Sequence, residues 1–159
     1  MKPLIKICGI AEKDNLIQLT KIEKIDFLGF IFYEHSLRNV TIDFVNSISH
    51  VDFKNKRPVC VYVNADKEFI EETSSYFVNP ILQFHGDETN TFCQSFKKDF
   101  WKVIRVKDAD SIKLVTDYPD ASGILFENYE TGIYGGTGNS FNWNLMNNIK
   151  DLDIKIILS

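Results

Sequence analysis

Short apolar runs recur along the chain, and each is bounded by polar or turn-forming residues. Their length is typical of β-strands. Several are apolar throughout, as expected for parallel strands that are covered on both faces. The predicted strands are Leu4–Cys8, Phe27–Phe32, Pro58–Val63, Pro80–Phe84, Trp101–Val106, Gly123–Phe126 and Lys155–Leu158. The pattern therefore indicates a sheet of buried, parallel strands.

The segments between these runs have the spacing of helices. In residues 69–77, one face holds Phe69, Ile70, Thr73, Tyr76 and Phe77, and glutamates occupy other positions. Six such helical segments are predicted to alternate with the strands.

Three shorter helices are predicted from local signals. Thr41 is a predicted N-cap for a stripe that begins at Phe44. Phe92, Phe96 and Phe100 recur every four residues after Asp87 and Glu88, acidic residues that suit a helix N-terminus. A further stripe of Ile112 and Val115 follows Asp108.

Alternating strands and helices are compatible with two α/β architectures, a doubly wound open sheet and a closed TIM (β/α)₈-type barrel. The even recurrence of the units favours the barrel. Such barrels usually need upward of about 200 residues, whereas this chain has 159 residues. Seven strands are predicted, the last near Leu158, so we expect residues 1–159 to form a single barrel domain that is incomplete at its C-terminus.

Composition narrows the class of protein. Hydrophobic residues make up 44% of the chain and charged residues 25%, which is enough for an enclosed core. The net charge of -4 argues against nucleic-acid binding. No apolar run approaches a membrane span, and the opening residues predict no secretory signal. The three cysteines, Cys8, Cys60 and Cys93, fit neither a disulfide framework nor a zinc site. A cytoplasmic location is predicted.

Candidate chemistry begins in the first strand. Its period of two puts Lys6 and Cys8 on one face. A nearby ammonium favours the thiolate, which would make Cys8 a base or a nucleophile. The alternative is that Cys8 is a small core residue.

Two later loops carry further candidates. Arg38 follows the second strand, where an arginine can hold a carboxylate or phosphate, although a solvated surface arginine is common. Gln83 and His85 share a face at the end of the fourth strand, the end at which barrel active sites lie. A purely structural role for His85 is the alternative. No second histidine stands at the spacing of a metal site.

The segment Gly135-Gly136-Thr137-Gly138 is rich in glycine but matches no standard phosphate loop. It lacks the lysine of a P-loop and the last glycine of the G-x-G-x-x-G dinucleotide fingerprint. We interpret it as a glycine-rich lid over a pocket.

Taken in order, these motifs resemble those of phosphoribosylanthranilate isomerase over essentially the whole chain. The matching segments are Lys6–Ile10, Leu28–Phe32, Ser36–Arg38, Val61–Asn64, Gln83–Glu88, Gly135–Trp143 and Ile156–Ser159. The resemblance implies a small (β/α)₈ barrel of tryptophan biosynthesis. It also implies a cofactor-free Amadori rearrangement of N-(5-phosphoribosyl)anthranilate, the expected small-molecule partner.

The resemblance assigns roles to individual residues. Cys8 corresponds to the general base, and Arg38 to the residue that holds the anthranilate carboxylate. The remaining expected substrate-binding residues are Lys6, Gln83, His85, Gly136, Thr137 and Gly138. No metal ligand is expected.

Two departures from the family pattern stand out. Asn142 occupies the position where the resemblance places the general acid, an aspartate, and Glu127 is a candidate substitute. After Ser159 the family pattern continues with a glycine-rich phosphate loop and the eighth strand. We therefore expect the sequence to be a fragment of a longer protein. A short chain that covers its open sheet edges as a homodimer is the alternative.

Two other functions remain open. One is a catalytically silent relative that binds a sugar phosphate or an anthranilate-like ligand, or that serves as a partner domain of a fused enzyme. The other is a binding domain with a doubly wound sheet, in which the motif match misleads.

Overall fold

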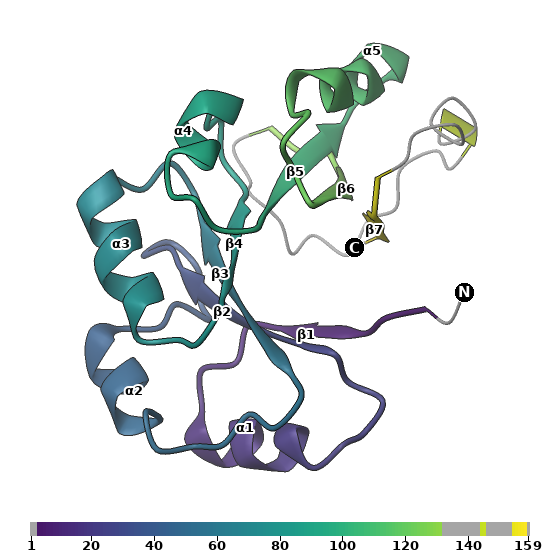
Figure 1. Cartoon of the computed structure of the whole chain (residues 1–159). Helices are drawn as coiled ribbons and strands as arrows, with labels where there is room; N and C mark the ends of the chain where they lie inside the picture. Colours follow the sequence, from purple (N-terminus) through teal and green to yellow (C-terminus); the bar gives the residue numbers. More distant parts are fainter. Residues whose placement is uncertain (1–2, 132–143, 146–153, 159) are drawn as a thin grey trace. The chain divides into compact units, whose positions relative to one another are not determined.

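A computed structural model describes residues 3–131, 144–145 and 154–158 (Figure 1). It divides into two compact units, Met1–Leu82 and Gln83–Ser159. The strands are β1 (Lys6–Cys8), β2 (Phe27–Phe32), β3 (Arg57–Tyr62), β4 (Ile81–Phe84), β5 (Phe100–Val106), β6 (Gly123–Asn128) and β7 (Ile156–Leu158). The helices are α1 (Lys13–Thr20), α2 (Ile42–Ser47), α3 (Lys67–Ser75), α4 (Asn90–Gln94), α5 (Ala109–Lys113) and the 3₁₀ helix η1 (Leu114–Asp117).

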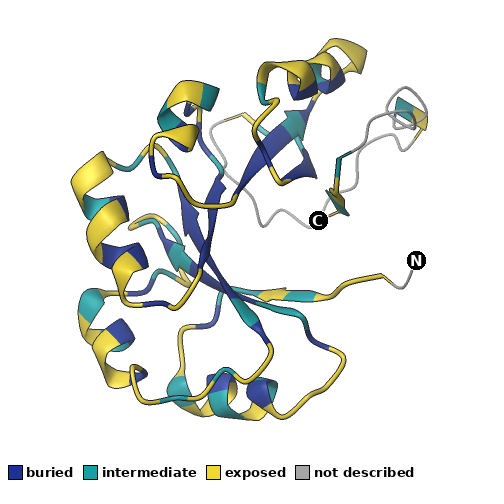
Figure 2. Cartoon of the chain, viewed as in Figure 1, coloured by how far each residue is buried: buried dark blue, intermediate teal, exposed yellow. Residues whose placement is uncertain are grey.

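In the first unit, β1, β2 and β3 pair in parallel. Phe27 is opposite Lys6 on one side and Arg57 on the other. The β2 and β3 strands are buried, whereas the helices bury one face and expose the other (Figure 2). The ring of Phe30 stacks on that of Phe53, with the ring centroids 5.8 Å apart, and lies tilted against that of Phe77, with the centroids 4.9 Å apart. Aromatic packing thus fills much of the core of this unit.

In the second unit, β5, β6 and β7 also pair in parallel. The register sets Arg105 opposite Glu127 and Ile124 opposite Ile156. This pairing matters for function because it brings the ends of β5 and β6 together. Among the residues that the structure describes, no helix combines the length and hydrophobicity needed to cross a membrane.

The strands follow one another in the hydrogen-bonded order β1 to β7, the same order as in the sequence. A doubly wound sheet reverses its strand order at a switch point, whereas a (β/α)₈ barrel keeps the order of the chain. The order therefore confirms the barrel-type fold class and rules out the doubly wound alternative.

Two helix predictions have different outcomes. The Thr41 N-cap is confirmed, because its hydroxyl accepts a hydrogen bond from Phe44 N at 3.3 Å. The helix predicted through Phe92, Phe96 and Phe100 is wrong beyond Gln94. Lys97 has a φ of 52°, in the left-handed region, so the chain turns and Phe100 begins β5 instead. The rings of these phenylalanines nevertheless pack around Phe84.

Candidate active site

Cys8 lies at the carboxyl end of β1, on the same face as Lys6. A Cβ on Gly29, the neighbouring residue of β2, would come within 2.8 Å of Cys8 Sγ and 3.0 Å of Lys6 Cε. Only a glycine fits there without displacing them, so both side chains lie against the Gly29 backbone. The prediction that Lys6 and Cys8 share a face is confirmed, and Cys8 is partly accessible.

Arg38 reaches back from the loop after β2 to the end of β1. Its Nη1 donates a hydrogen bond to the carbonyl oxygen of Cys8 at 2.9 Å. The guanidinium lies over Gly9, where a Cβ would come within 2.6 Å of Nη1. Gly9 also has a φ of 83°, which favours glycine. The structure therefore brings together Cys8 and Arg38, two residues singled out in the sequence.

His85 follows β4 and links two other polar side chains. The amide nitrogen of Gln83 faces His85 Nδ1 at 3.5 Å, and His85 Nε2 lies 2.6 Å from Glu127 Oε2 at the end of β6. One proton joins the imidazole and the carboxyl group, so either Nε2–H donates to an ionised Glu127 or a protonated Glu127 donates to Nε2. The His85 and Glu127 side chains are only 11% and 9% exposed. A carboxyl group and an imidazole are thus held ready for proton transfer.

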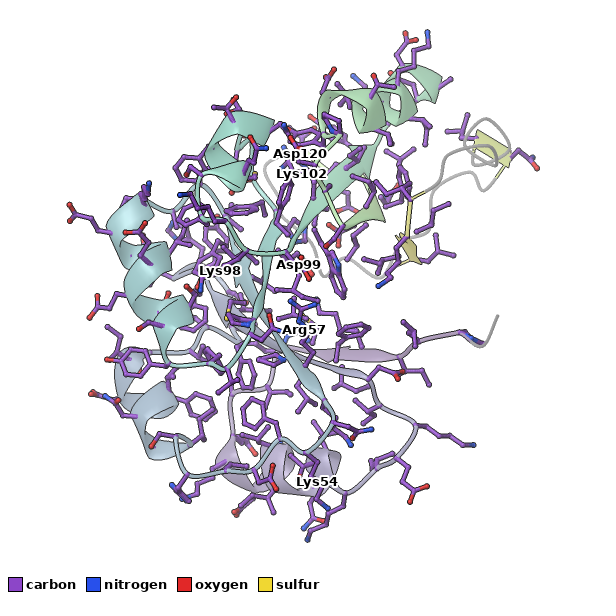
Figure 3. The ribbon with its side chains drawn as sticks, in the orientation of Figure 1. Lys54, Arg57, Lys98, Asp99, Lys102 and Asp120 are labelled. Atoms are coloured by element: carbon purple, nitrogen blue, oxygen red, sulfur yellow. The ribbon has the colours of Figure 1, made fainter. Side chains whose placement is uncertain are left out.

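A buried lysine of β5, Lys102, which is labelled in Figure 3, holds the turn that carries His85. Lys102 Nζ donates to Gly86 O at 2.6 Å, to Phe84 O at 3.3 Å and to Glu88 Oε2 at 3.1 Å. Glu88 Oε1 in turn accepts from Gly86 N at 3.3 Å. The Lys102 and Glu88 side chains are each 3% exposed, so the pair is taken out of water.

Sequence reasoning missed this pair. Glu88 was expected at the N-terminus of a helix, but the N-cap of α4 is Thr89, and Glu88 points to Lys102. The available signal was Lys102 itself, one of two charged residues in the otherwise apolar strand Trp101–Val106. A charge at such a position is buried only when it has partners.

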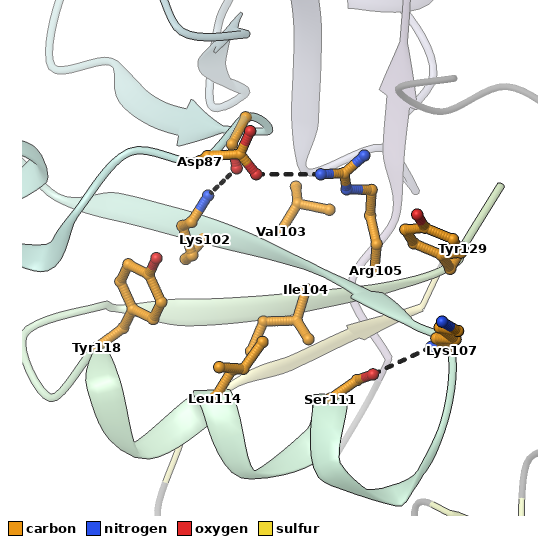
Figure 4. Close-up of a pocket in the computed structure, with 11 residues that line it drawn as sticks. Asp87, Lys102, Val103, Ile104, Arg105, Lys107, Ser111, Leu114, Tyr118 and Tyr129 are labelled. Carbon is orange, nitrogen blue, oxygen red and sulfur yellow. Dashed lines mark hydrogen bonds and ion pairs between the residues drawn. The ribbon is translucent and has the colours of Figure 1, made fainter. Parts of the chain in front are cut away.

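A pocket of about 370 Å³ lies at β5 and its flanking segments (Figure 4). Arg105 Nη2 pairs with Asp87 Oδ1 at 3.1 Å, and the ring of Tyr129 lies 5.7 Å from Arg105 Cζ and 5.8 Å from Lys107 Nζ. The polar lining comprises Asp87, Lys102, Arg105, Lys107, Ser111, Tyr118 and Tyr129. The cations of this lining suit an anionic ligand, and the Tyr129 ring lies against two of them.

Two hydroxyl and thiol groups near the buried pair stay protonated. Tyr118 donates from its hydroxyl to Glu88 O at 2.9 Å, and burial raises its pKa to about 12. Burial also raises the pKa of the Cys93 thiol to about 12. Neither group is therefore a nucleophile near neutral pH.

Four predicted site residues lie outside the described part of the chain. They are Gly136, Thr137 and Gly138 of the predicted lid, and Asn142 at the expected general-acid position. Their roles stay predictions.

Comparisons with known proteins agree with the motif order. Residues 5–159 match the family described as N-(5'phosphoribosyl)anthranilate (PRA) isomerase. The enzyme of that name from Nitrosomonas europaea is 37% identical over 147 residues, which cover 92% of this chain and 69% of the relative. The enzyme of the same name from Pseudomonas savastanoi pv. phaseolicola is 35% identical, over 97% of this chain and 74% of the relative.

Solved structures show the same fold. Phosphoribosyl anthranilate isomerase from Thermotoga maritima superimposes with a TM-score of 0.83 at 26% identity, over 99% of this chain and 77% of that one. A dimeric phosphoribosylanthranilate isomerase from Thermotoga maritima, in monomers made from it, gives a TM-score of 0.80 at 24% identity, covering 99% of this chain and 75% of that one.

A third solved structure is an isomerase of this kind in complex with reduced 1-(o-carboxyphenylamino)-1-deoxyribulose 5-phosphate. It has a TM-score of 0.79 at 23% identity, and covers 99% of this chain and 75% of that chain. The family model spans nearly the whole chain, and the relatives share more than a third of the aligned residues. This chain therefore belongs to the N-(5'-phosphoribosyl)anthranilate isomerase family, the isomerases of tryptophan biosynthesis.

Proposed function

We propose that this chain converts N-(5-phosphoribosyl)anthranilate to 1-(2-carboxyphenylamino)-1-deoxyribulose 5-phosphate by an Amadori rearrangement. Membership of the isomerase family supports the reaction, and a solved relative holds the reduced form of this product. The reaction moves hydrogen within one molecule, so acid, base and binding groups suffice and no cofactor enters the proposal.

The base in this proposal is Cys8. A proton donor first protonates the furanose ring oxygen, and the bond from that oxygen to C1 breaks to give an open-chain iminium ion. The Cys8 thiolate then takes the proton from C2. The electron pair of that C–H bond forms a C1–C2 double bond and neutralises the iminium. The resulting enol tautomerises to the ketone product, so atoms and charge balance.

The proton donor in this proposal is Glu127. Its carboxyl group stands at the end of β6, is nearly buried, and shares a hydrogen bond of 2.6 Å with His85. In this role Glu127 carries the proton that it shares with His85, and a nearly buried carboxyl group is a common general acid. The amide of Asn142 can donate a hydrogen bond but cannot deliver a proton near neutral pH. Glu127 therefore takes the role that the sequence pattern had placed at Asn142.

The observation that carries the proposal is the contact of Arg38 with the end of β1. The Arg38 guanidinium lies 2.9 Å from the carbonyl oxygen of Cys8, the residue that carries the candidate base. One of its five N–H groups makes this bond. We propose that Arg38 binds the anthranilate carboxylate and so brings the sugar carbons near Cys8.

The test follows the loss of phosphoribosylanthranilate by its fluorescence, with the purified chain. Cys8→Ala and Glu127→Gln are expected to lower kcat on the order of 10²–10⁴-fold, the usual contribution of a positioned acid or base. Glu71→Gln changes an exposed carboxylate on α3 and serves as the matched control for Glu127→Gln. Turnover that survives Cys8→Ala unchanged would contradict the assignment of the base.

A second measurement separates catalysis from binding alone. Calorimetric titration with the reduced product analogue reports binding without chemistry. Binding without any turnover by the parent chain would favour the silent relative considered in the sequence. Loss of that binding in Arg38→Ala, with full binding in the β3 variant Arg57→Ala, is expected if Arg38 holds the carboxylate.

A homodimer stays a prediction for this chain. Apolar side chains are exposed at β1 and β7: Ile7 is 36% exposed and Leu158 50%. Unpaired strand edges with apolar side chains favour association. Sedimentation velocity at several concentrations tests it, and a single monomeric species throughout would exclude the dimer.

A further inference from the structure

One buried ammonium group makes three of the hydrogen bonds that attach the turn that carries His85 to the rest of its unit. Lys102 Nζ donates to Phe84 O and Gly86 O, the carbonyl groups on the two sides of His85 in the sequence. Its third donor goes to Glu88 Oε2. All three N–H groups of the lysine are thus used on the segment 84–88.

Glu88 completes the attachment. One carboxylate oxygen accepts from Lys102, and the other accepts from Gly86 N at 3.3 Å. Tyr118, which directly follows η1, donates a hydrogen bond from its hydroxyl group to Glu88 O. The backbone of the turn is therefore fixed by hydrogen bonds to the side chains of Lys102 and Glu88 and to the hydroxyl group of Tyr118.

A contribution to stability does not by itself explain the buried Lys102–Glu88 pair. A buried ion pair is weak evidence for stability, because desolvation of the two charges offsets much of their attraction. What the Lys102–Glu88 pair does supply is direction, since it fixes the carbonyl groups on both sides of His85. The neighbouring His85 then meets Glu127 at 2.6 Å, a distance that tolerates little displacement.

We propose that Lys102 and Glu88 are positioning residues for the reaction, which hold His85 in the orientation that its hydrogen bond to Glu127 requires. This inference rests on the proposed role of Glu127 as proton donor for its catalytic consequence, but its structural content does not. Neither residue touches substrate in this proposal, and both act through the turn 84–88.

The test uses the three histidines of the chain. His35 and His50 are exposed, whereas His85 Nε2 is shielded and shares a short hydrogen bond with the carboxyl group of Glu127. A short hydrogen bond between an imidazole and a carboxyl group shifts its proton strongly downfield and slows its exchange with water. NMR of this proton therefore reports the His85–Glu127 bond directly, without any turnover, and the carbon-bound ring protons of His35 and His50 serve as internal references.

Three variants divide positioning from stability. Lys102→Met leaves Glu88 buried without its partner, so it is expected to lose the downfield signal and to be less stable. Lys102→Met/Glu88→Met removes both charges while keeping similar volume, so it is expected to fold and to regain part of the lost stability, although Phe84 O, Gly86 O and Gly86 N lose these partners. Lys113→Met removes a lysine of an exposed ion pair with Asp110 and is the control.

The double variant decides the question. Positioning predicts that its His85 signal is lost although the protein is folded, and that the signal persists in Lys113→Met. A parental His85 signal in the folded double variant would overturn the proposal, because stability would then be the pair's only contribution. Should Lys102→Met fail to fold, the double variant alone gives the answer.

The same variants link the inference to catalysis. If Glu127 donates the proton, loss of the His85 signal should accompany a fall in kcat of up to about 10²-fold with little change in KM, because geometry and not affinity is affected. Loss of the signal with unchanged kcat would leave the positioning of His85 intact and contradict the role proposed for Glu127.

Discussion

Cys8 and His85 each stand at the carboxyl end of a strand, but they are held in place differently. Around Cys8, side-chain atoms are absent where they would interfere: Gly29 leaves space for the thiol, and Gly9 leaves space for Arg38. Around His85, charged atoms are added, because Lys102 and Glu88 are buried to fix the turn.

This difference predicts different sensitivity to substitution. A site made by glycines tolerates the loss of a neighbouring charge, but not the gain of a methyl group. A site fixed by a buried ion pair is most sensitive to the loss of one charge, because the partner is left without compensation. Each prediction below tests one side of this comparison.

The largest effect is expected from breaking the buried pair. Lys102→Met should lower the free energy of unfolding by about 3–5 kcal/mol, because it leaves the Glu88 carboxylate buried without its cation. Urea denaturation followed by circular dichroism measures the loss. The double replacement of Lys102 and Glu88 by methionine should recover part of it, because the backbone groups that the pair bonded still lose their partners. A loss of less than about 1 kcal/mol in Lys102→Met, as for an exposed pair, would show that the pair is not desolvated in solution.

The next effect concerns the glycines. Gly29→Ala should destabilise by about 1–3 kcal/mol, as overpacking does, and it should displace the Cys8 thiol, which would lie only 2.8 Å from the new methyl group. Alkylation by iodoacetamide measures the position of the thiol, since Cys60 and Cys93 are buried.

Gly123→Ala is the matched control for this change. Its methyl group would come within 2.9 Å of Trp101 Cδ1, a comparable clash that does not involve Cys8. We expect similar destabilisation with a parental alkylation rate. Equal changes in alkylation in both variants would mean that Cys8 responds to general loosening rather than to Gly29.

The glycine environment was partly visible in the sequence, and the ion pair was not. Cys8 and Arg38 were identified because short motifs at strand ends carry them. Lys102 and Glu88 are 14 residues apart, and although Glu88 ends the segment Gln83–Glu88, no matching segment includes Lys102. The two residues can pair because Glu88 lies before helix α4, and not in its first turn as the sequence suggested. Thr89 and Lys97 decide where that helix begins and ends, through a side-chain cap and a left-handed backbone that propensity alone did not reveal.

The free energy of unfolding should fall at alkaline pH because of two groups near the His85 turn. Burial raises the pKa of Cys93 and of Tyr118 to about 12, from ordinary values of 9 and 10. Both groups stay protonated longer in the folded state, so their contribution to stability is complete below about pH 9 and is lost as the pH rises toward 12. Urea denaturation between about pH 8 and about pH 12 should show no loss from these groups up to about pH 9 and a progressive fall in stability from there toward pH 12.

Tyr118→Phe isolates one part of this dependence. It removes the hydroxyl that donates to Glu88 O, which should cost about 1 kcal/mol at neutral pH. It should also flatten the fall in stability above about pH 10. A variant as pH-dependent as the parent would show that the Tyr118 hydroxyl is equally easy to ionise in the folded and unfolded states.

The smallest effect provides the baseline for the comparison. Asp66 caps α3 by accepting a hydrogen bond from Phe69 N at 2.8 Å, and it contacts neither cluster. Asp66→Ala should cost about 1 kcal/mol, as the loss of an N-cap typically does. The Cys8 alkylation rate and the His85 proton signal should both be unchanged. Movement of either signal at this cost would mean that mild destabilisation alone disturbs the candidate site, and the effects of Gly29→Ala and Lys102→Met would then lose their specificity.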